Sequence, residues 1–158
     1  MILVTVGTQI PFPRMLNLVS KWSEKNNNTE IIAQVGIGGT FYQNFRCVEL
    51  FGKDEFDKIL SKADLVVSHA GMGSILSSLT QGKPIIVMPR LASLSEHRND
   101  HQTATARAMQ NKPSVNVVWN ENELMQALDN INKFQLSEKI SCFAPDEIIN
   151  ALSNLINE

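Results

Sequence analysis

Cysteine is scarce in this chain. The 158 residues contain only Cys47 and Cys142, which lie far apart and lack the close spacing of metal ligands. A disulfide framework or a cysteine-based zinc site is therefore a poor explanation of the fold, and we expect two reduced thiols in a cytoplasmic protein, with pairing as the disfavoured alternative.

Long apolar runs are also missing. None approaches the ~20 residues that a membrane-spanning helix needs. The apolar stretch at the amino terminus is short and no basic region precedes it, so it predicts a first strand and no signal peptide.

The chain has almost no excess charge of either sign. Its 14 Lys and Arg against 16 Asp and Glu give a net charge of −2. Nucleic acid or a strongly anionic membrane is therefore not expected as the main partner. The content of 43% hydrophobic and 19% charged residues is typical of a soluble globular protein. At this length we expect one domain, spanning residues 1–158, without internal repeats.

Apolar runs alternate with helical apolar patterns along the sequence. Strands are predicted at 1–6, 30–35, 46–51 and 63–67, after Pro84, and at 114–119; helices are predicted around 15–22, 54–61, 75–79, 96–111, 120–132 and 146–157. This order predicts an α/β fold, a Rossmann-like parallel sheet with helices on both faces. Ligands of such sheets bind at the carboxyl ends of the strands. Gly7, Gly36 and Gly71 directly follow strands, so we expect all three at that edge.

The segment from Ser68 to Arg90 reads as strand, glycine loop, helix, turn and strand. Gly71 and Gly73 permit close approach of the backbone to a ligand, and free N–H groups at a helix start attract anions. His69 and Ser74 flank the loop, and both side chains can hydrogen-bond phosphate. We therefore expect a phosphate or diphosphate here; a purely structural tight turn is the alternative.

Four segments together resemble a known family. They are VTVGT at 4–8, SHAGMGSIL at 68–76, GKPIIVMPR at 82–90 and EHRNDHQ at 96–102. In this order they resemble the C-terminal, donor-binding domain of family 28 glycosyltransferases, which have the two-domain GT-B fold. Within the family, the chain is similar to free-standing catalytic subunits of two-component bacterial exopolysaccharide and capsule transferases. It is also similar to the eukaryotic cytosolic subunit that acts in dolichol-linked N-acetylglucosamine transfer.

The resemblance implies a set of donor-binding residues and no metal or other cofactor. The set is Gly7, Thr8, His69, Gly71, Met72, Gly73, Ser74, Arg90, Asp100, His101 and Gln102. Within it, Asp100, His101 and Gln102 are expected at the donor sugar and the others near the diphosphate. His69 is a weak candidate for the catalytic base, since GT-B enzymes usually take that group from the acceptor half.

Four positions leave alternatives open. His97 and His101 lie four residues apart, so a metal site on one helix face competes with a solvated helix start. Arg90 faces either the diphosphate or the acceptor, or it forms a surface ion pair. Ser77 stands where many relatives have a glutamate that grips the ribose, so Glu55, Asp57 or a partner must supply that contact.

The resemblance implies a glycosyltransferase subunit that moves a sugar from a UDP-sugar to a lipid-linked saccharide by an inverting, metal-independent reaction. It further implies a membrane-anchored, acceptor-binding partner at the cytoplasmic membrane face. The apolar stripe at 146–157 is a candidate contact for that partner, and self-association is expected in its absence. A non-catalytic nucleotide-sugar-binding or regulatory subunit is the alternative. An NAD-dependent reductase is disfavoured, because Gly36–Gly39 lacks the full dinucleotide spacing.

Overall fold

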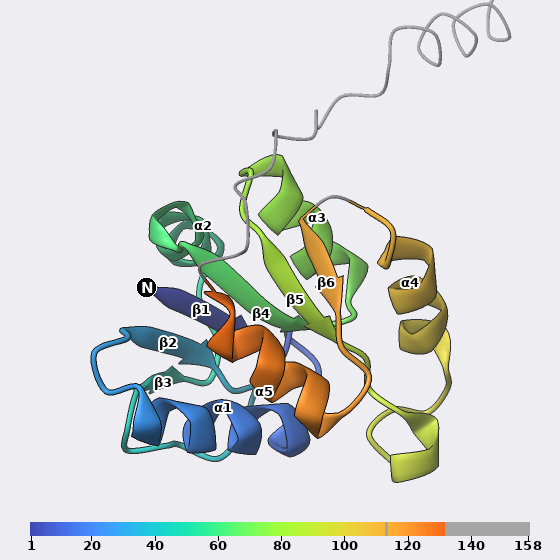
Figure 1. Cartoon of the computed structure of the whole chain (residues 1–158), viewed down its shortest axis with the longest axis horizontal. Helices are drawn as coiled ribbons and strands as arrows, with labels where there is room; N and C mark the ends of the chain where they lie inside the picture. Colours follow the sequence, from blue (N-terminus) through green and yellow to red (C-terminus); the bar gives the residue numbers. More distant parts are fainter. Residues whose placement is uncertain (113, 132–158) are drawn as a thin grey trace, which may run out of the picture.

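A computed structural model describes residues 1–112 and 114–131 (Figure 1). Its strands are β1 (Ile2–Thr5), β2 (Ile31–Gln34), β3 (Arg46–Val48), β4 (Leu65–His69), β5 (Ile85–Met88) and β6 (Val115–Val117). Its α-helices are α1 (Pro13–Lys25), α2 (Lys53–Lys62), α3 (Met72–Thr80), α4 (His101–Met109) and α5 (Glu121–Asp129), with a short 3₁₀ helix at Ala92–Leu94.

The strands form one six-stranded sheet in the order β3-β2-β1-β4-β5-β6, and all neighbours are parallel. From β1 the chain builds outward through β2 and β3, then returns to place β4 on the other side of β1. The strand order therefore reverses between β1 and β4, where Thr5 pairs with Ser68. In open α/β sheets, the crevice at such a reversal is the usual ligand site.

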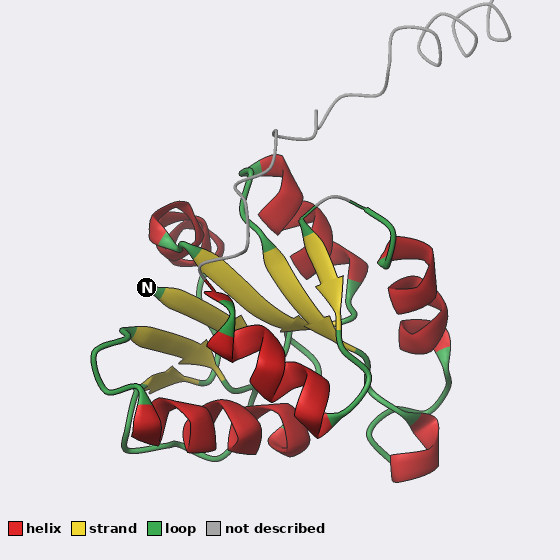
Figure 2. Ribbon diagram, viewed as in Figure 1, coloured by secondary structure: helices red, strands yellow, loops and turns green. Residues whose placement is uncertain are grey.

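Helices cover both faces of the sheet (Figure 2). Along β1, Ile2 and Val4 belong to the apolar cluster beneath α1 and α5, while Leu3 belongs to the cluster beneath α2, α3 and α4. This alternation follows from the two-residue period of a strand. Every residue of β1 is buried. The layered parallel fold predicted from the sequence is thus confirmed.

Several element boundaries differ from the prediction. The third strand is much shorter than 46–51, since it ends at Val48 and leaves Phe51 in the connection to α2. In α3, Ile75 and Leu79 are buried as expected, but Leu76 is 46% exposed. The predicted helix at 146–157 and Cys142 lie outside the described residues.

The largest difference concerns the helix expected from Glu96. Helix α4 begins only at His101. Ser95 has a left-handed backbone (φ 56°), which interrupts helical geometry. The carboxylate of Glu96 accepts hydrogen bonds from Arg14 and from the Leu91 N–H, at 2.6–2.9 Å. Residues 96–100 are consequently held as a loop.

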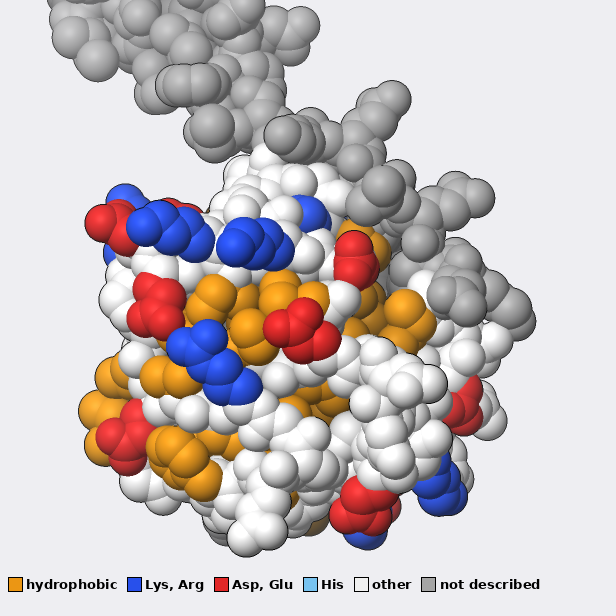
Figure 3. Space-filling model, turned by 90° about the vertical axis from the view of Figure 1, so that its left-hand side faces the viewer, with side chains coloured by type: hydrophobic (Ala, Val, Ile, Leu, Met, Phe, Trp, Pro, Cys, Tyr) orange, Lys and Arg blue, Asp and Glu red, His pale blue; other side chains and the backbone are white. Residues whose placement is uncertain are grey.

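Figure 3 shows the side of the molecule that lies on the left in Figure 1, where apolar side chains gather between charged ones of both signs. The loop between β2 and β3 exposes Ile37 (61%) and Phe41 (58%). Among residues 1–112 and 114–131, no helix has the length and apolar character needed to cross a membrane.

Candidate functional site

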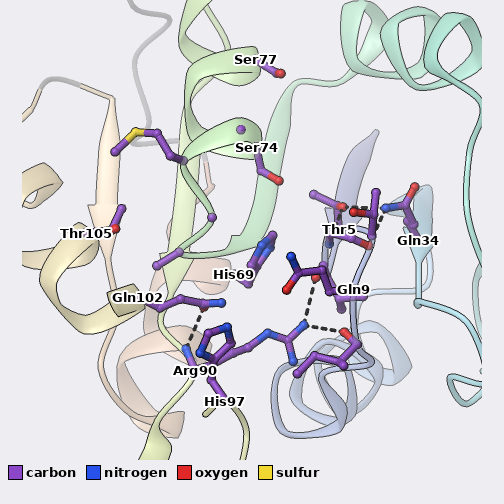
Figure 4. Close-up of a pocket in the computed structure, with 18 of the residues that line it drawn as sticks. Thr5, Gln9, Gln34, His69, Ser74, Ser77, Arg90, His97, Gln102 and Thr105 are labelled. Atoms are coloured by element: carbon purple, nitrogen blue, oxygen red, sulfur yellow. Dashed lines mark hydrogen bonds between the residues drawn. The ribbon is translucent and has the colours of Figure 1, made fainter. Parts of the chain in front are cut away.

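A cavity of about 670 Å³ opens at the carboxyl edge of the sheet, at the reversal between β1 and β4. Its walls come from the loop after β1, the start of α2, the start of α3 and the start of α4. Figure 4 shows Gln102 and Thr105 on one side and Thr5 and Gln34 on the other, with His69 between them. All three histidines of the chain, His69, His97 and His101, line this cavity.

The imidazole of His69 lies between two glycines. A Cβ built on Gly7 would lie 2.6 Å from the His69 Cε1 atom, and a Cβ on Gly71 would overlap the ring at Nε2. Gly7 also has a φ of 79°, a backbone conformation that is unfavourable for residues with a Cβ atom. These two glycines are therefore required by the packing of His69, a reason that the sequence did not reveal. All three glycines follow the carboxyl ends of parallel strands, as expected, but only Gly7 and Gly71 line the cavity and Gly36 does not.

Helix α3 begins at Met72 and directs its first turn at the cavity, which Gly71, Met72, Gly73 and Ser74 all line. No side chain caps this helix start. Its first N–H groups are therefore free for an anion, and the helix dipole favours negative charge there. A Cβ on Gly73 would meet no atom within 4 Å, so this position faces open space.

Gln34 braces the loop after β1. Its side-chain N–H₂ donates to the Gly7 carbonyl oxygen (2.8 Å) and to Thr5 Oγ1 (3.3 Å), and its Oε1 accepts from the Phe51 N–H (3.0 Å). Sequence reasoning missed this residue. A single glutamine at the end of an otherwise apolar strand was the available signal.

Arg90 lines the floor of the cavity and is 2% exposed. Its guanidinium donates hydrogen bonds to the carbonyl oxygens of Val6, Ile10 and Pro11, at 2.6–2.9 Å. The surface ion pair offered as an alternative is therefore wrong. Burial lowers the pKa of Arg90 to about 10, against the raising effect of Glu96, so the group is charged at neutral pH.

The wall on the side of α4 is polar. Gln102 is 9% exposed, and its Oε1 accepts from the Arg90 N–H (3.1 Å). This hydrogen bond occupies the Oε1 atom of Gln102. Figure 4 shows the nitrogen of the same side-chain amide directed towards His69. His97, His101 and Thr105 complete this wall. His97 was considered only as a metal ligand, and Thr105 was not considered.

Asp100 does not line the cavity. Its side chain accepts from the Ala92 N–H (3.4 Å) at the start of α4. His97 lies in the loop before α4, so it does not share a helix face with His101 as the metal hypothesis required. Within the described part of the chain, no group of three or more His, Cys, Asp or Glu side chains is placed to hold a metal.

The wall on the side of α2 carries two aromatic rings, Phe51 and Phe56, together with Lys53 and, from α3, Ser77. Neither acid suggested as a substitute for the missing glutamate lines the cavity. Glu55 instead pairs with Arg46 on the surface, at 3.3 Å. The cavity wall, as far as the structure describes it, has no carboxylate.

His69 is uncharged at neutral pH. Burial is the main cause that lowers its pKa to about 4, and the nearby positive charge of Arg90 adds to this effect. Its Nδ1 lies 3.3 Å from Ser68 Oγ. A neutral imidazole can donate one hydrogen bond to an anion, but with this pKa it is a weak base.

The low pKa of His69 predicts a pH-dependent stability. Between the ordinary value of 6.5 and about 4, the unfolded chain takes up a proton that the folded protein does not. Stability that is present above pH 6.5 is therefore lost as the pH falls, by up to about 3 kcal/mol. We expect urea unfolding at pH 7 and pH 4.5 to show a much smaller difference for His69→Gln than for the unchanged protein. Parallel pH dependence in both proteins would contradict the buried neutral state.

Comparison with known proteins identifies the relatives of this fold and site. UDP-N-acetylglucosamine transferase subunit ALG13 of Kluyveromyces lactis is 39% identical over 79 residues, which cover 50% of this chain and 39% of that protein. The mouse protein of the same name is 39% identical over 74 residues, which cover 43% of this chain and 6% of the mouse protein. The matches therefore span well under half of each relative.

Solved structures share the fold at low sequence identity. The NMR structure of ALG13 superimposes with a TM-score of 0.62 and 21% identity, covering 96% of this chain and 93% of that one. The crystal structure of the kitacinnamycin glycotransferase gives 0.65 and 18%, covering 98% and 37%. The family model for the glycosyltransferase family 28 C-terminal domain matches residues 1–153. The chain therefore belongs to the glycosyltransferase family 28 C-terminal domain family.

Proposed function

We propose that this chain is the donor-binding subunit of a glycosyltransferase and that it binds a UDP-sugar in the cavity at the carboxyl edge of the sheet. The observation that carries the proposal is the start of α3, where uncapped N–H groups, Gly73 and Ser74 face the cavity beside His69. This arrangement suits a diphosphate, because amide donors and the helix dipole both favour anions. Family membership supports the same ligand class.

The chemistry of the two side walls suggests the orientation of the donor. Phe51 and Phe56 offer aromatic surface for a planar base at the α2 side. Gln102 and His101 offer hydrogen-bonding groups for a hydroxyl-rich sugar at the α4 side. The diphosphate then lies between them, near Gly7, Thr8 and the start of α3. Asp100, outside the cavity wall, has no part in this arrangement.

In the proposed reaction, negative charge builds on the departing diphosphate as the bond from sugar to phosphate breaks. Fixed N–H groups at the α3 start and the neutral His69 ring stabilise that charge without reorganising. We assign the general base to the acceptor side, because His69 with a pKa of about 4 accepts protons poorly at neutral pH. The reaction inverts the configuration of the sugar and needs no metal ion from this chain.

We further propose that a membrane-anchored partner supplies the acceptor half of the cleft. The relatives are described as subunits of a UDP-N-acetylglucosamine transferase. As acceptor we propose a saccharide linked to a polyprenyl diphosphate, made for exopolysaccharide or capsule at the cytoplasmic face of the membrane, in line with the family resemblance of the sequence. The apolar stripe at 146–157, outside the described residues, remains our candidate for the partner contact.

A subunit that binds nucleotide-sugars without catalysing transfer is the second candidate function, because the described cavity wall has no carboxylate and His69, with a pKa of about 4, accepts protons poorly. Calorimetry with UDP, UDP-sugars and NAD tests the shared ligand class. Binding of NAD in preference to UDP would contradict both candidates.

Gly73→Ala should weaken UDP binding by about tenfold or more without unfolding the protein. The new Cβ meets no protein atom, yet it occupies the space through which a diphosphate reaches the α3 amides. Gly52→Ala is a matched control, since its Cβ also meets nothing and Gly52 does not line the cavity. Calorimetry that finds equal UDP affinity for both variants would place the diphosphate elsewhere.

Gln102→Ala should lower the affinity for a UDP-sugar several-fold while UDP affinity stays nearly unchanged, because the lost amide faces the sugar. Gln110→Ala, at the exposed end of the same helix, serves as the control. The measurement is calorimetry with UDP and with a panel of UDP-sugars. Equal losses for UDP and UDP-sugar in Gln102→Ala would assign Gln102 another role.

The purified chain should bind UDP but transfer no sugar until membranes containing the partner are added. The physical reason is that the described cavity has donor-binding groups on one side only, and a lipid-linked acceptor needs its own site. The assay follows sugar transfer to a defined lipid-linked acceptor with and without those membranes. Robust transfer by the chain alone would contradict the division into two subunits.

A further inference from the structure

We propose that Arg90 is a positioning residue of the donor site: its buried guanidinium holds the loop after β1 in the shape that receives the diphosphate. This inference rests on the function proposed above. It assigns Arg90 a role through the loop, in place of the direct ligand contact that the family resemblance implied.

Three hydrogen bonds define the role. Nη1 donates to the Pro11 carbonyl oxygen (2.6 Å), and Nη2 donates to those of Ile10 (2.6 Å) and Val6 (2.9 Å). These carbonyls bracket residues 7–10, and all four of those residues line the cavity. One planar group therefore ties together both ends of the loop. Lysine, with a compact ammonium on a flexible stem, does not reproduce this planar fork.

The backbone of Arg90 also fixes the opposite wall. Its N–H donates to Gln102 Oε1 at 3.1 Å. The side chain of Arg90 thus holds the wall proposed for the diphosphate, and its main chain holds the wall proposed for the sugar. The distance between the two walls, and with it the geometry offered to a nucleotide-sugar, depends on this residue.

A second set of contacts anchors the main chain on either side of Arg90. Arg14 donates to the Pro89 carbonyl oxygen (3.0 Å), and the Glu96 carboxylate accepts from the Leu91 N–H (2.9 Å). Arg14 and Glu96 form an ion pair of 2.6 Å with little exposure. Because these contacts do not use the Arg90 side chain, the strand end should stay in place when that side chain is replaced.

The aromatic ring of Phe12 packs against the Arg90 guanidinium. The Arg90 guanidinium lies 4.6 Å from its centroid and the Arg14 guanidinium 5.3 Å. Phe12 is fully buried, so the ring presents a desolvated surface to the cation. The guanidinium is thereby confined to one orientation, which is the requirement for a residue that sets the path of a loop.

The test compares Arg90→Met with Arg46→Met, which makes the same change at an exposed arginine outside the cavity wall. Hydrogen exchange of the ligand-free protein reports on the loop, and calorimetry reports UDP affinity. The informative loop amide is that of Gly7, which donates to Thr5 Oγ1 (3.1 Å) and belongs to the same peptide group as the Val6 carbonyl bound by Arg90. In Arg90→Met we expect exchange of this amide to accelerate at least tenfold, exchange in β4 to stay within about twofold, and UDP to bind about 10- to 100-fold more weakly. Arg46→Met should change none of these by more than about twofold.

Arg90→Lys and Arg90→Ala extend the test, including the case in which Arg90→Met does not fold. Lysine keeps the charge without the planar fork, so its loop should exchange at a rate between those of the unchanged protein and Arg90→Ala. Added methylguanidinium, but not methylammonium, should restore slow loop exchange and UDP affinity to Arg90→Ala, a rescue that a general loss of stability would not show.

Two results would overturn the proposal: unchanged loop exchange in the Arg90 variants, or exchange raised equally in β4. Unchanged loop exchange together with lost UDP affinity would assign Arg90 to direct ligand contact. If the unchanged protein does not bind UDP, the proposed function fails by that result alone. The exchange comparison, made without ligand, still decides whether Arg90 holds the loop.

Discussion

The structure of the candidate site depends on one buried cation beneath the reversal of strand order. Arg90 brings a positive charge to the end of β5, where its three hydrogen bonds go to carbonyl oxygens of the loop after β1. Leaving the buried Val6 carbonyl oxygen without a donor costs about 1–3 kcal/mol, so this loop and the guanidinium stabilise one another. The charge of Arg90 also helps to keep His69 neutral, which leaves the imidazole as a hydrogen-bonding group between Gly7 and Gly71.

Much of the fold could be predicted because its determinants are local. A strand buried on both faces is apolar at nearly every position, and in Ile2–Thr5 only Thr5 is polar. An amphipathic helix repeats its apolar residues at helical spacing, as the segment from Met15 to Trp22 does. The predicted start of α4 at residue 96 was wrong because a contact between residues far apart in the sequence decides where the helix begins. Glu96 is bound by Arg14, which lies 82 residues earlier, and the local pattern of residues 96–102 contains no sign of that pairing.

The residues of the candidate site also fall into those that local sequence predicts and those that only the tertiary structure brings together. His69, Gly71, Gly73 and Ser74 were predictable because they lie on one strand-loop-helix unit, whose geometry follows from its own sequence. Gln34 and Thr105 were missed and His97 was considered only as a metal ligand, since tertiary structure brings these three residues to the cavity from elements outside that unit. Asp100 shows that membership of a sequence motif does not by itself place a side chain in the cavity. Its neighbours His101 and Gln102 line the cavity, but the turn at the start of α4 directs its carboxylate to the Ala92 N–H.

The charge of the cavity wall constrains what this chain can contribute to the proposed reaction. The described lining contains Lys53, Arg90 and three histidines, and none of its side chains is an acid. Such a wall attracts a diphosphate, and it stabilises the charge that develops when a diphosphate departs. The same wall offers no carboxylate to deprotonate an acceptor hydroxyl, and a carboxylate beside a bound diphosphate would be repelled by its negative charge. In the function proposed above, a base on a partner across the cleft would therefore let one surface bind the anion and another activate the acceptor.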